Sequence, residues 1–220
     1  MMTRVKICCI ETEDMARQAI AAGASALGLV TAMPSGPGVI SDATARRIAS
    51  LAPPGVATFL LTSQTDPTRL VAQVAAAGAN VVQIVDAVAP AAYAALRQAL
   101  PAVKIVQVIH VEGEAALDAA RAIAPQVDGL LLDSGRPNAA TKELGGTGRV
   151  HDWAVSRRIV VAVPCPVYLA GGLGPGNVAD AIQAVRPFGV DLCSGVRTDG
   201  RLDAQKLGAL MGAVHAAVQS

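Results

Sequence analysis

The chain has 220 residues, of which 52% are hydrophobic and only 16% charged, so it can bury a substantial core. A formal charge of +1 and the absence of any Lys/Arg run argue against a nucleic acid or an anionic membrane as partner. No apolar stretch is long enough to span a bilayer, and the N-terminus reaches a strand-like segment without a signal-peptide pattern, so we expect a cytoplasmic protein.

Short β-branched runs alternate with helix-length, Ala-rich stretches along the whole chain. The predicted strands are residues 4–10, 26–30, 56–61, 81–85, 103–109, 129–133, 167–170 and 190–194. Strands that alternate with helices form parallel βαβ units. We therefore predict an α/β fold with a single domain over residues 1–220, a (β/α)8 TIM barrel. A doubly wound open sheet is the alternative.

Helix punctuation supports this division. A helix is predicted to begin at the N-cap Asp66 with Pro67 in its first turn and to end at Gly78. The helix over 12–22 should end at Gly23, and Asn177 should open another. Residues 203–218 predict a final amphipathic helix. In such a barrel the active site lies at the carboxyl ends of the strands.

The first strand carries adjacent cysteines in "VKICCIETED". Strand side chains alternate between two faces. If Cys9 faces the helices with Val5 and Ile7, then Lys6 and Cys8 face the barrel interior. Cys8 is therefore the candidate for chemistry and Cys9 is expected to be a small apolar packing residue. The alternative is that both are buried packing residues.

The other cysteines and the histidines suggest no metal site. Cys165 and Cys193 lie far from the first pair, no CxxC is present, and the three histidines have no metal-ligand spacing. We expect reduced thiols, no metal and no cofactor.

The sixth strand ends in "GLLLDSG", which places Asp133 at the rim on the same face as Leu131. A carboxyl that ends an apolar strand is costly to bury without a partner. Since the sixth strand lies across a barrel from the first, Asp133 and Cys8 can face each other across a small ligand. A solvent-exposed cap is the alternative for Asp133.

Glycines follow the last two predicted strands, in "YLAGGLGPGN" and "DLCSGVRTDG". Backbone N–H groups free of side chains, together with helix N-termini, bind anions, and these two loops hold the usual phosphate site of a barrel. They therefore predict phosphate binding, with turn formation as the alternative. The long segment 134–150 contains Gly146 within "GGTGRVHDW" and is predicted to be a lid, or else a surface excursion.

Together the motifs "VKIC", "LLDS", "GGTG" followed by "DW", "LAGGLGPGNV" and "GVDLCSGV" resemble the phosphoribosylanthranilate isomerase family of tryptophan biosynthesis. The resemblance runs the whole length of the chain. It implies a monomeric or homodimeric barrel enzyme that acts on a small-molecule phosphosugar.

The resemblance also implies residue roles. Cys8 takes the place of the general base and Asp133 that of the general acid in an Amadori-type aldose–ketose isomerisation. The expected substrate is N-(5'-phosphoribosyl)anthranilate. The implied phosphate and substrate contacts are Gly171, Gly172, Ser194 and Gly195, with Gly146 in the lid.

Some positions depart from the family pattern. Cys9 replaces a glycine, Gly38 falls where an arginine grips the anthranilate carboxylate, and Val85 replaces a substrate-site histidine. Arg197 stands in place of a glutamate, and either Arg136 or Arg197 is expected to take over from the missing arginine. These departures leave two alternatives open: a paralogue that acts on another sugar phosphate, or a non-enzymatic phosphometabolite-binding protein.

Overall fold

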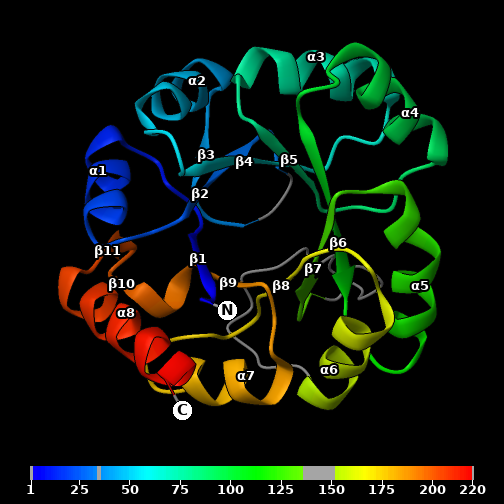
Figure 1. Cartoon of the computed structure of the whole chain (residues 1–220). Helices are drawn as coiled ribbons and strands as arrows, with labels where there is room; N and C mark the ends of the chain where they lie inside the picture. Colours follow the sequence, from blue (N-terminus) through cyan, green and yellow to red (C-terminus); the bar gives the residue numbers. More distant parts are fainter. Residues whose placement is uncertain (1, 34–35, 136–151, 220) are drawn as a thin grey trace.

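The computed structural model describes residues 2–33, 36–135 and 152–219. Within these residues eight parallel strands form a closed barrel (Figure 1), namely β1 (Arg4–Ile7), β2 (Ala26–Thr31), β4 (Ala57–Thr62), β5 (Val81–Ile84), β6 (Lys104–His110), β7 (Gly129–Asp133), β8 (Val167–Leu169) and β9 (Gly189–Leu192). Each barrel strand pairs with the next along the chain. Strand β1 pairs with both β2 and β9 and so closes the ring. The predicted (β/α)8 barrel is confirmed, and the open-sheet alternative is wrong.

The helices surround the barrel as an outer ring (Figure 1). They are α1 (Glu13–Ala21), α2 (Asp42–Leu51), α3 (Pro67–Ala77), α4 (Pro90–Ala99), α5 (Ala115–Ile123), α6 (Trp153–Ala162), α7 (Val178–Val185) and α8 (Ala204–Gln219). Shorter elements are β3 (Val39–Ile40), the 3-10 turns η1 (Ala124–Gln126) and η2 (Ser194–Val196), and the hairpin of β10 (Arg197–Thr198) and β11 (Arg201–Leu202). None of the helices in the described ranges has the length and hydropathy needed to cross a bilayer.

Local capping explains where several helices begin and end. The side chain of Asp66 accepts a hydrogen bond from the Arg69 N–H at 2.9 Å, ahead of Pro67 in the first turn of α3. Gly78 ends this helix at φ +67°, in the left-handed region that glycine tolerates. The predicted start and end of α3 are thus confirmed.

Two apolar layers hold the fold together. The outer layer packs the helices against strand residues such as Ile7, Leu60 and Leu130, and the inner layer fills the barrel. In the inner layer the rings of Phe59 and Tyr168 meet edge to face, with centroids 5.5 Å apart. Such a packed interior leaves the open end of the barrel as the place for a ligand.

The first strand differs from its prediction. Strand β1 ends at Ile7 rather than at residue 10, and Cys9 has φ +58°, in the left-handed region. The alternation of side chains therefore continues to Cys8 and stops at Cys9. Cys8 and Cys9 both belong to the inner layer, so the expectation that Cys9 packs toward the helices is wrong, while Cys8 faces the interior as expected.

Candidate active site

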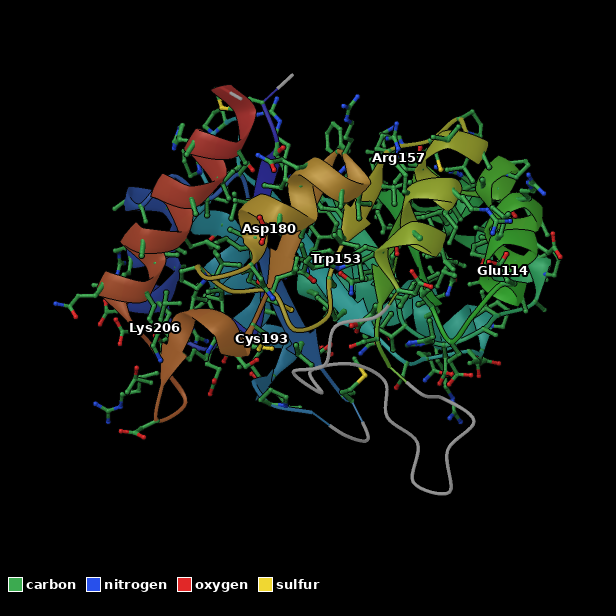
Figure 2. All side chains as sticks on the ribbon, turned by 90° about the horizontal axis from the view of Figure 1, so that it is seen from below. Glu114, Trp153, Arg157, Asp180, Cys193 and Lys206 are labelled. Atoms are coloured by element: carbon green, nitrogen blue, oxygen red, sulfur yellow. The ribbon has the colours of Figure 1, made fainter. Side chains whose placement is uncertain are left out.

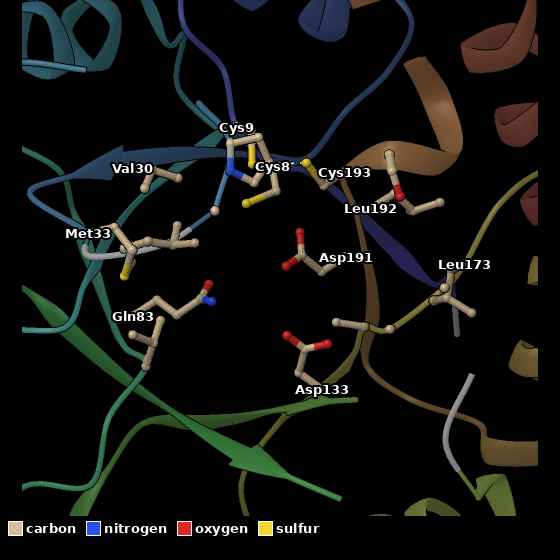
Figure 3. A pocket seen from close by; sticks show the side chains of 18 residues that line it. Cys8, Cys9, Val30, Met33, Gln83, Asp133, Leu173, Asp191, Leu192 and Cys193 are labelled. Carbon is tan, nitrogen blue, oxygen red and sulfur yellow. Dashed lines mark hydrogen bonds between the residues drawn. The ribbon is translucent and has the colours of Figure 1, made fainter. Parts of the chain in front are cut away.

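A pocket opens at the carboxyl ends of the barrel strands (Figure 3). Its lining comes from seven barrel strands and the segments that follow them: Cys8, Cys9, Val30, Met33, Gly36, Pro37, Leu61, Gln83, Val85, Asp133, Ala170, Gly171, Gly172, Leu173, Asp191, Leu192, Cys193 and Ser194. The side view in Figure 2 places Cys193 at the lower end of the molecule, where β9 ends.

Cys8 and Asp133 lie on opposite sides of this pocket, as the sequence predicted (Figure 3). The Cys8 N–H donates to the Leu192 carbonyl at 2.8 Å, which fixes the backbone beside β9. A Cβ on Gly28 would lie 2.8 Å from Cys8 Sγ and 3.1 Å from Lys6 Nζ. Glycine at position 28 therefore leaves room for the thiol and the lysine, which places a positive charge near the Cys8 sulfur.

Asp133 ends β7 as a buried carboxyl, with only 9% of its surface exposed. Burial raises its pKa above the ordinary value, and the negative charge of Asp191 acts in the same direction. The Ser134 N–H donates to Asp133 Oδ1 at 2.7 Å and, with the nearby His110 and Lys6, partly offsets the rise. A carboxyl with a raised pKa keeps more of its acid form toward neutral pH, which suits a proton donor.

Asp191 is a site residue that the sequence reasoning missed. It lies on β9, lines the pocket, and its carboxyl points toward the same space as that of Asp133 (Figure 3). Its Oδ1 lies 2.8 Å from Lys6 Nζ, which is fully buried and 5.3 Å from the centre of the Phe59 ring. Burial alone would lower the pKa of Lys6, but the charge of Asp191 raises it above its ordinary value. Lys6 therefore stays protonated.

Gln83 was missed as well. It is buried on β5, and its side chain points into the pocket (Figure 3). Among the described residues its Oε1 atom has no hydrogen-bond partner. A buried acceptor without a partner is available to a ligand donor. The signal for both missed residues was a polar side chain inside an apolar strand, in "VVQIV" and "GVDL".

A second hollow adjoins the pocket and is formed by the β8–α7 and β9–η2 segments. Its lining is Gly172, Leu173, Gly174, Gly176, Asn177, Ser194 and Gly195. The side chain of Asn177 shapes the first segment, since its Oδ1 accepts from the Gly174 N–H at 2.8 Å and its Nδ2 donates to the Gly172 carbonyl at 3.0 Å.

Three glycines keep this hollow and the adjoining pocket open. Gly171 and Gly172 have φ of +85° and +63°, in the left-handed region. A Cβ on Gly195 would overlap the Leu173 carbonyl oxygen. The hollow thus combines exposed backbone with the first turns of α7 and η2, which suits an anion.

Arg197 lies outside both linings. Its guanidinium donates to the carbonyls of Cys193 at 2.6 Å, Cys8 at 2.8 Å and Cys9 at 2.7 Å. These bonds tie the end of β1 to the end of β9, so Arg197 is engaged within the protein and not directed toward a ligand. Arg136 and Gly146, the other predicted contacts, lie outside the described residues.

The positions that depart from the expected pattern are partly in contact. Gly38 has φ +78°, and a Cβ there would lie 2.7 Å from the Cys9 Cβ. Gly38 therefore provides the space that the Cys9 side chain fills. Val85 forms part of the apolar wall of the pocket.

No metal site is evident in the part of the chain that the structure describes. No three His, Cys, Asp or Glu side chains in it are grouped to hold a metal ion. The arrangement instead offers a thiol, a buried acid and an anion cradle around one cavity, a set suited to proton transfers on a phosphorylated ligand.

Comparisons with known proteins agree with this geometry. Residues 5–213 match a family model described as N-(5'phosphoribosyl)anthranilate (PRA) isomerase. The curated N-(5'-phosphoribosyl)anthranilate isomerase of Methanocella arvoryzae is 38% identical over 200 residues, which cover 91% of this chain and 92% of that protein.

Solved structures of the same kind superpose on nearly the whole chain. The phosphoribosyl anthranilate isomerase of Thermus thermophilus has a TM-score of 0.82 at 29% identity and covers 97% of this chain and 99% of its own. A structure of such an isomerase in complex with reduced 1-(o-carboxyphenylamino)-1-deoxyribulose 5-phosphate has a TM-score of 0.78 at 26% identity, with 98% and 100% covered.

Proposed function

The chain belongs to the N-(5'-phosphoribosyl)anthranilate isomerase family, and from that premise we propose that Cys8 and Asp133 carry out its aldose–ketose isomerisation in the pocket described above. The observation that carries this assignment is the placement of the two side chains on opposite sides of one cavity, next to a glycine-lined cradle (Figure 3). The comparisons give no support to a different sugar phosphate as substrate.

The proposed reaction begins at Asp133. Its carboxyl protonates the ring oxygen of the ribose, the bond from that oxygen to C1' breaks, and the amine nitrogen forms a protonated Schiff base with C1'. The raised pKa of Asp133 favours this role because the acid form must be present near neutral pH.

Cys8 acts in the second step. Its thiolate removes the proton from C2', and the electron pair moves into an enolamine. Proton return to C1' and loss of the hydroxyl proton at C2' then give the ketose. The buried ammonium of Lys6 places a positive charge near the Cys8 sulfur.

The phosphate of the substrate is assigned to the glycine-lined hollow. Gly172, Ser194 and Gly195 border this hollow, and Gly171 lines the adjoining pocket. The exposed backbone and helical first turns of the hollow favour an anion. The anthranilate ring is assigned to the apolar wall that includes Val30, Leu61 and Val85.

Two polar groups are assigned to the remaining parts of the substrate. Gln83 offers its free oxygen to a hydroxyl or amine of the substrate. Arg136 stays a prediction as the partner of the carboxylate, because Arg197 is held by three carbonyls.

The test is turnover of N-(5'-phosphoribosyl)anthranilate by the purified protein. We expect activity in the unmutated enzyme and a loss of about a hundredfold or more in Cys8→Ser and in Asp133→Asn, the size expected for removal of a general acid or base. Cys165→Ser is the matched control, because that cysteine lies outside both pocket linings. Absence of turnover by the unmutated protein, or full activity in both variants, would overturn the assignment.

Location and assembly belong to the same proposal. We infer a cytoplasmic enzyme that works as a monomer or homodimer. The solved isomerase from Thermotoga maritima is described as dimeric, with engineered monomers, and is 25% identical to this chain. Sedimentation of the purified protein at micromolar concentration distinguishes the two states.

A further inference from the structure

Two thiols that the isomerisation does not use lie against each other at the pocket. The Sγ atoms of Cys9 and Cys193 are 2.9 Å apart and share a hydrogen bond, although 184 positions separate the residues in the chain. Figure 3 shows the two side chains side by side on the wall that carries Cys8. A disulfide bond is about 2.05 Å long, so these sulfurs need to approach by less than about 1 Å to form one.

The backbone around the pair is already fixed. Cys9 and Cys193 each lie just past the end of a barrel strand, and those strands, β1 and β9, pair in parallel with Ile7 opposite Leu192. Arg197 donates to the carbonyls of both cysteines, at 2.7 and 2.6 Å. The two segments are therefore joined before any covalent bond forms, and a cross-link requires a movement of less than about 1 Å.

One thiol of the pair is suited to react first. Cys193 lines the pocket and is only partly buried, so a small oxidant can reach it. The hydrogen bond with Cys9 lowers the pKa of the Cys193 thiol, and the Arg197 guanidinium, 3.6 Å away, acts in the same direction. The same contact raises the pKa of Cys9, which therefore keeps its proton. The thiolate is the form that attacks oxidants.

We propose that Cys9 and Cys193 form a redox-active dithiol at the active-site mouth, which hydrogen peroxide or an organic hydroperoxide converts into a reversible disulfide. The Cys193 thiolate attacks a peroxide oxygen, the O–O bond breaks, and a sulfenic acid forms as hydroxide leaves. The Cys9 sulfur then attacks the sulfenic sulfur, the S–O bond breaks, and water leaves with the Cys9 proton. In total two thiols lose two electrons, and one hydrogen peroxide molecule becomes two waters.

The disulfide is expected to lower enzymatic activity, a consequence that rests on the proposed function. Cys9 is the direct neighbour of Cys8, so a shift of its sulfur by somewhat less than 1 Å moves the segment that positions the Cys8 thiol. A displacement of that size at a reacting group can cost about a hundredfold in rate. We therefore expect a drop of at least about tenfold in kcat, restored by dithiothreitol.

The chemical test uses the double variant Cys8→Ser/Cys165→Ser, in which Cys9 and Cys193 are the remaining thiols of the chain. After native treatment with hydrogen peroxide we expect both thiols to disappear from a thiol titration and the intact mass to fall by about 2 Da. Dithiothreitol should reverse both changes. The matched control adds Cys193→Ser, and its single thiol cannot produce the mass loss.

Three results would overturn the dithiol. They are persistence of both thiols, a gain of oxygen mass without the loss, and a wild-type cross-link that peptide mapping assigns to Cys8. This readout needs no substrate, so it is independent of the proposed reaction.

The second test measures turnover of oxidised and reduced wild-type enzyme. A disulfide that leaves kcat unchanged would overturn the effect on activity.

Discussion

Because Asp133 is buried, its carboxyl holds its proton to a higher pH than an ordinary carboxyl does. Its pKa lies above the usual 3.8, chiefly because the side chain is desolvated. Between that ordinary value and the raised one, the folded protein binds the proton more tightly than the unfolded chain does. The free energy of unfolding therefore falls as pH rises through this interval, and the loss is complete above it.

Asparagine at position 133 escapes this cost because it cannot ionise. We expect Asp133→Asn to be more stable than the unmutated protein at pH 7, because the raised pKa of Asp133 makes its ionisation costly in the folded state. Its amide oxygen can still accept from the Ser134 N–H. The gain should shrink as pH falls toward the ordinary value of 3.8 and vanish well below it, where Asp133 holds its proton in both the folded and the unfolded protein.

Urea denaturation of both proteins at pH 7 and pH 4 measures this difference. If Asp133→Asn is less stable than the unmutated protein by the same margin at pH 7 and at pH 4, ionisation of Asp133 does not destabilise the fold. Because the same substitution should abolish turnover, stability and activity are expected to change in opposite directions.

At the scale of elements, the cradle depends on how closely the β8–α7 and β9–η2 segments approach. Gly195 packs against Leu173 and Gly174, and a Cβ at position 195 would lie 3.0 Å from Gly174 Cα as well as overlapping the Leu173 carbonyl. The backbone of Leu173 and Gly174 cannot move away from an added Cβ as a flexible side chain could. A side chain at this position must therefore separate the two segments.

Gly195→Ala is expected to raise KM by about tenfold or more, a loss of at least about 1.4 kcal/mol in substrate binding, with a smaller change in kcat. The reason is that the phosphate contacts move while Cys8 and Asp133 stay in place. Steady-state kinetics measures both constants. Gly208→Ala in α8, where an added Cβ meets nothing within 4 Å, is the matched control. An unchanged KM in folded Gly195→Ala would place the phosphate elsewhere.

The elements also show what the sequence could and could not predict. The alternation of apolar runs with capped, Ala-rich stretches predicted all eight barrel strands and the bounds of α3, because each of these signals is local. The end of β1 was not predictable in the same way. Apolar residues continue from Cys8 to Ile10, and the residue types give no sign of the left-handed backbone at Cys9.

Some residues of the candidate site could likewise be predicted from local sequence signals, and others could not. Cys8, Asp133 and the glycine pairs stand at strand ends, where the fold class alone directs attention. Asp191 and Gln83 lie within apolar strands, and their roles depend on which face they occupy. The contact of Cys9 with Cys193 arises only from the closure of β1 onto β9, which no local pattern reports.

At the scale of the whole molecule, a buried ion pair lies where the barrel closes. Lys6 on β1 and Asp191 on β9 are direct partners in the strand register, and their side chains meet inside the barrel at 2.8 Å. Removing one partner leaves the other charge buried without a counter-charge, which is far more costly than removing both. The pKa of Lys6 is raised, so the stability it contributes is present below its unfolded pKa and is lost only as pH rises through the folded value.

We expect Lys6→Met to lower the free energy of unfolding by about 3 kcal/mol at pH 7, and Asp191→Asn to lower it by a comparable amount. The double variant should lose much less than the sum of the two. Urea denaturation in a double-mutant cycle measures the coupling. Arg17→Ala breaks an exposed pair with Glu13 and, as the control, should cost within about 1 kcal/mol. Additive losses at Lys6 and Asp191 would contradict the coupling.

Because Gly38 lies against Cys9, the order in which positions 9 and 38 are substituted matters. A side chain introduced at 38 alone would collide with Cys9 and would also occupy a left-handed backbone, so such a variant is penalised twice. With glycine first at position 9, the shortest contact, 2.7 Å to the Cys9 Cβ, is removed before position 38 changes. A larger residue at 38 is therefore more easily introduced after position 9 has become glycine than before it. Both orders lead to the same pair of residues.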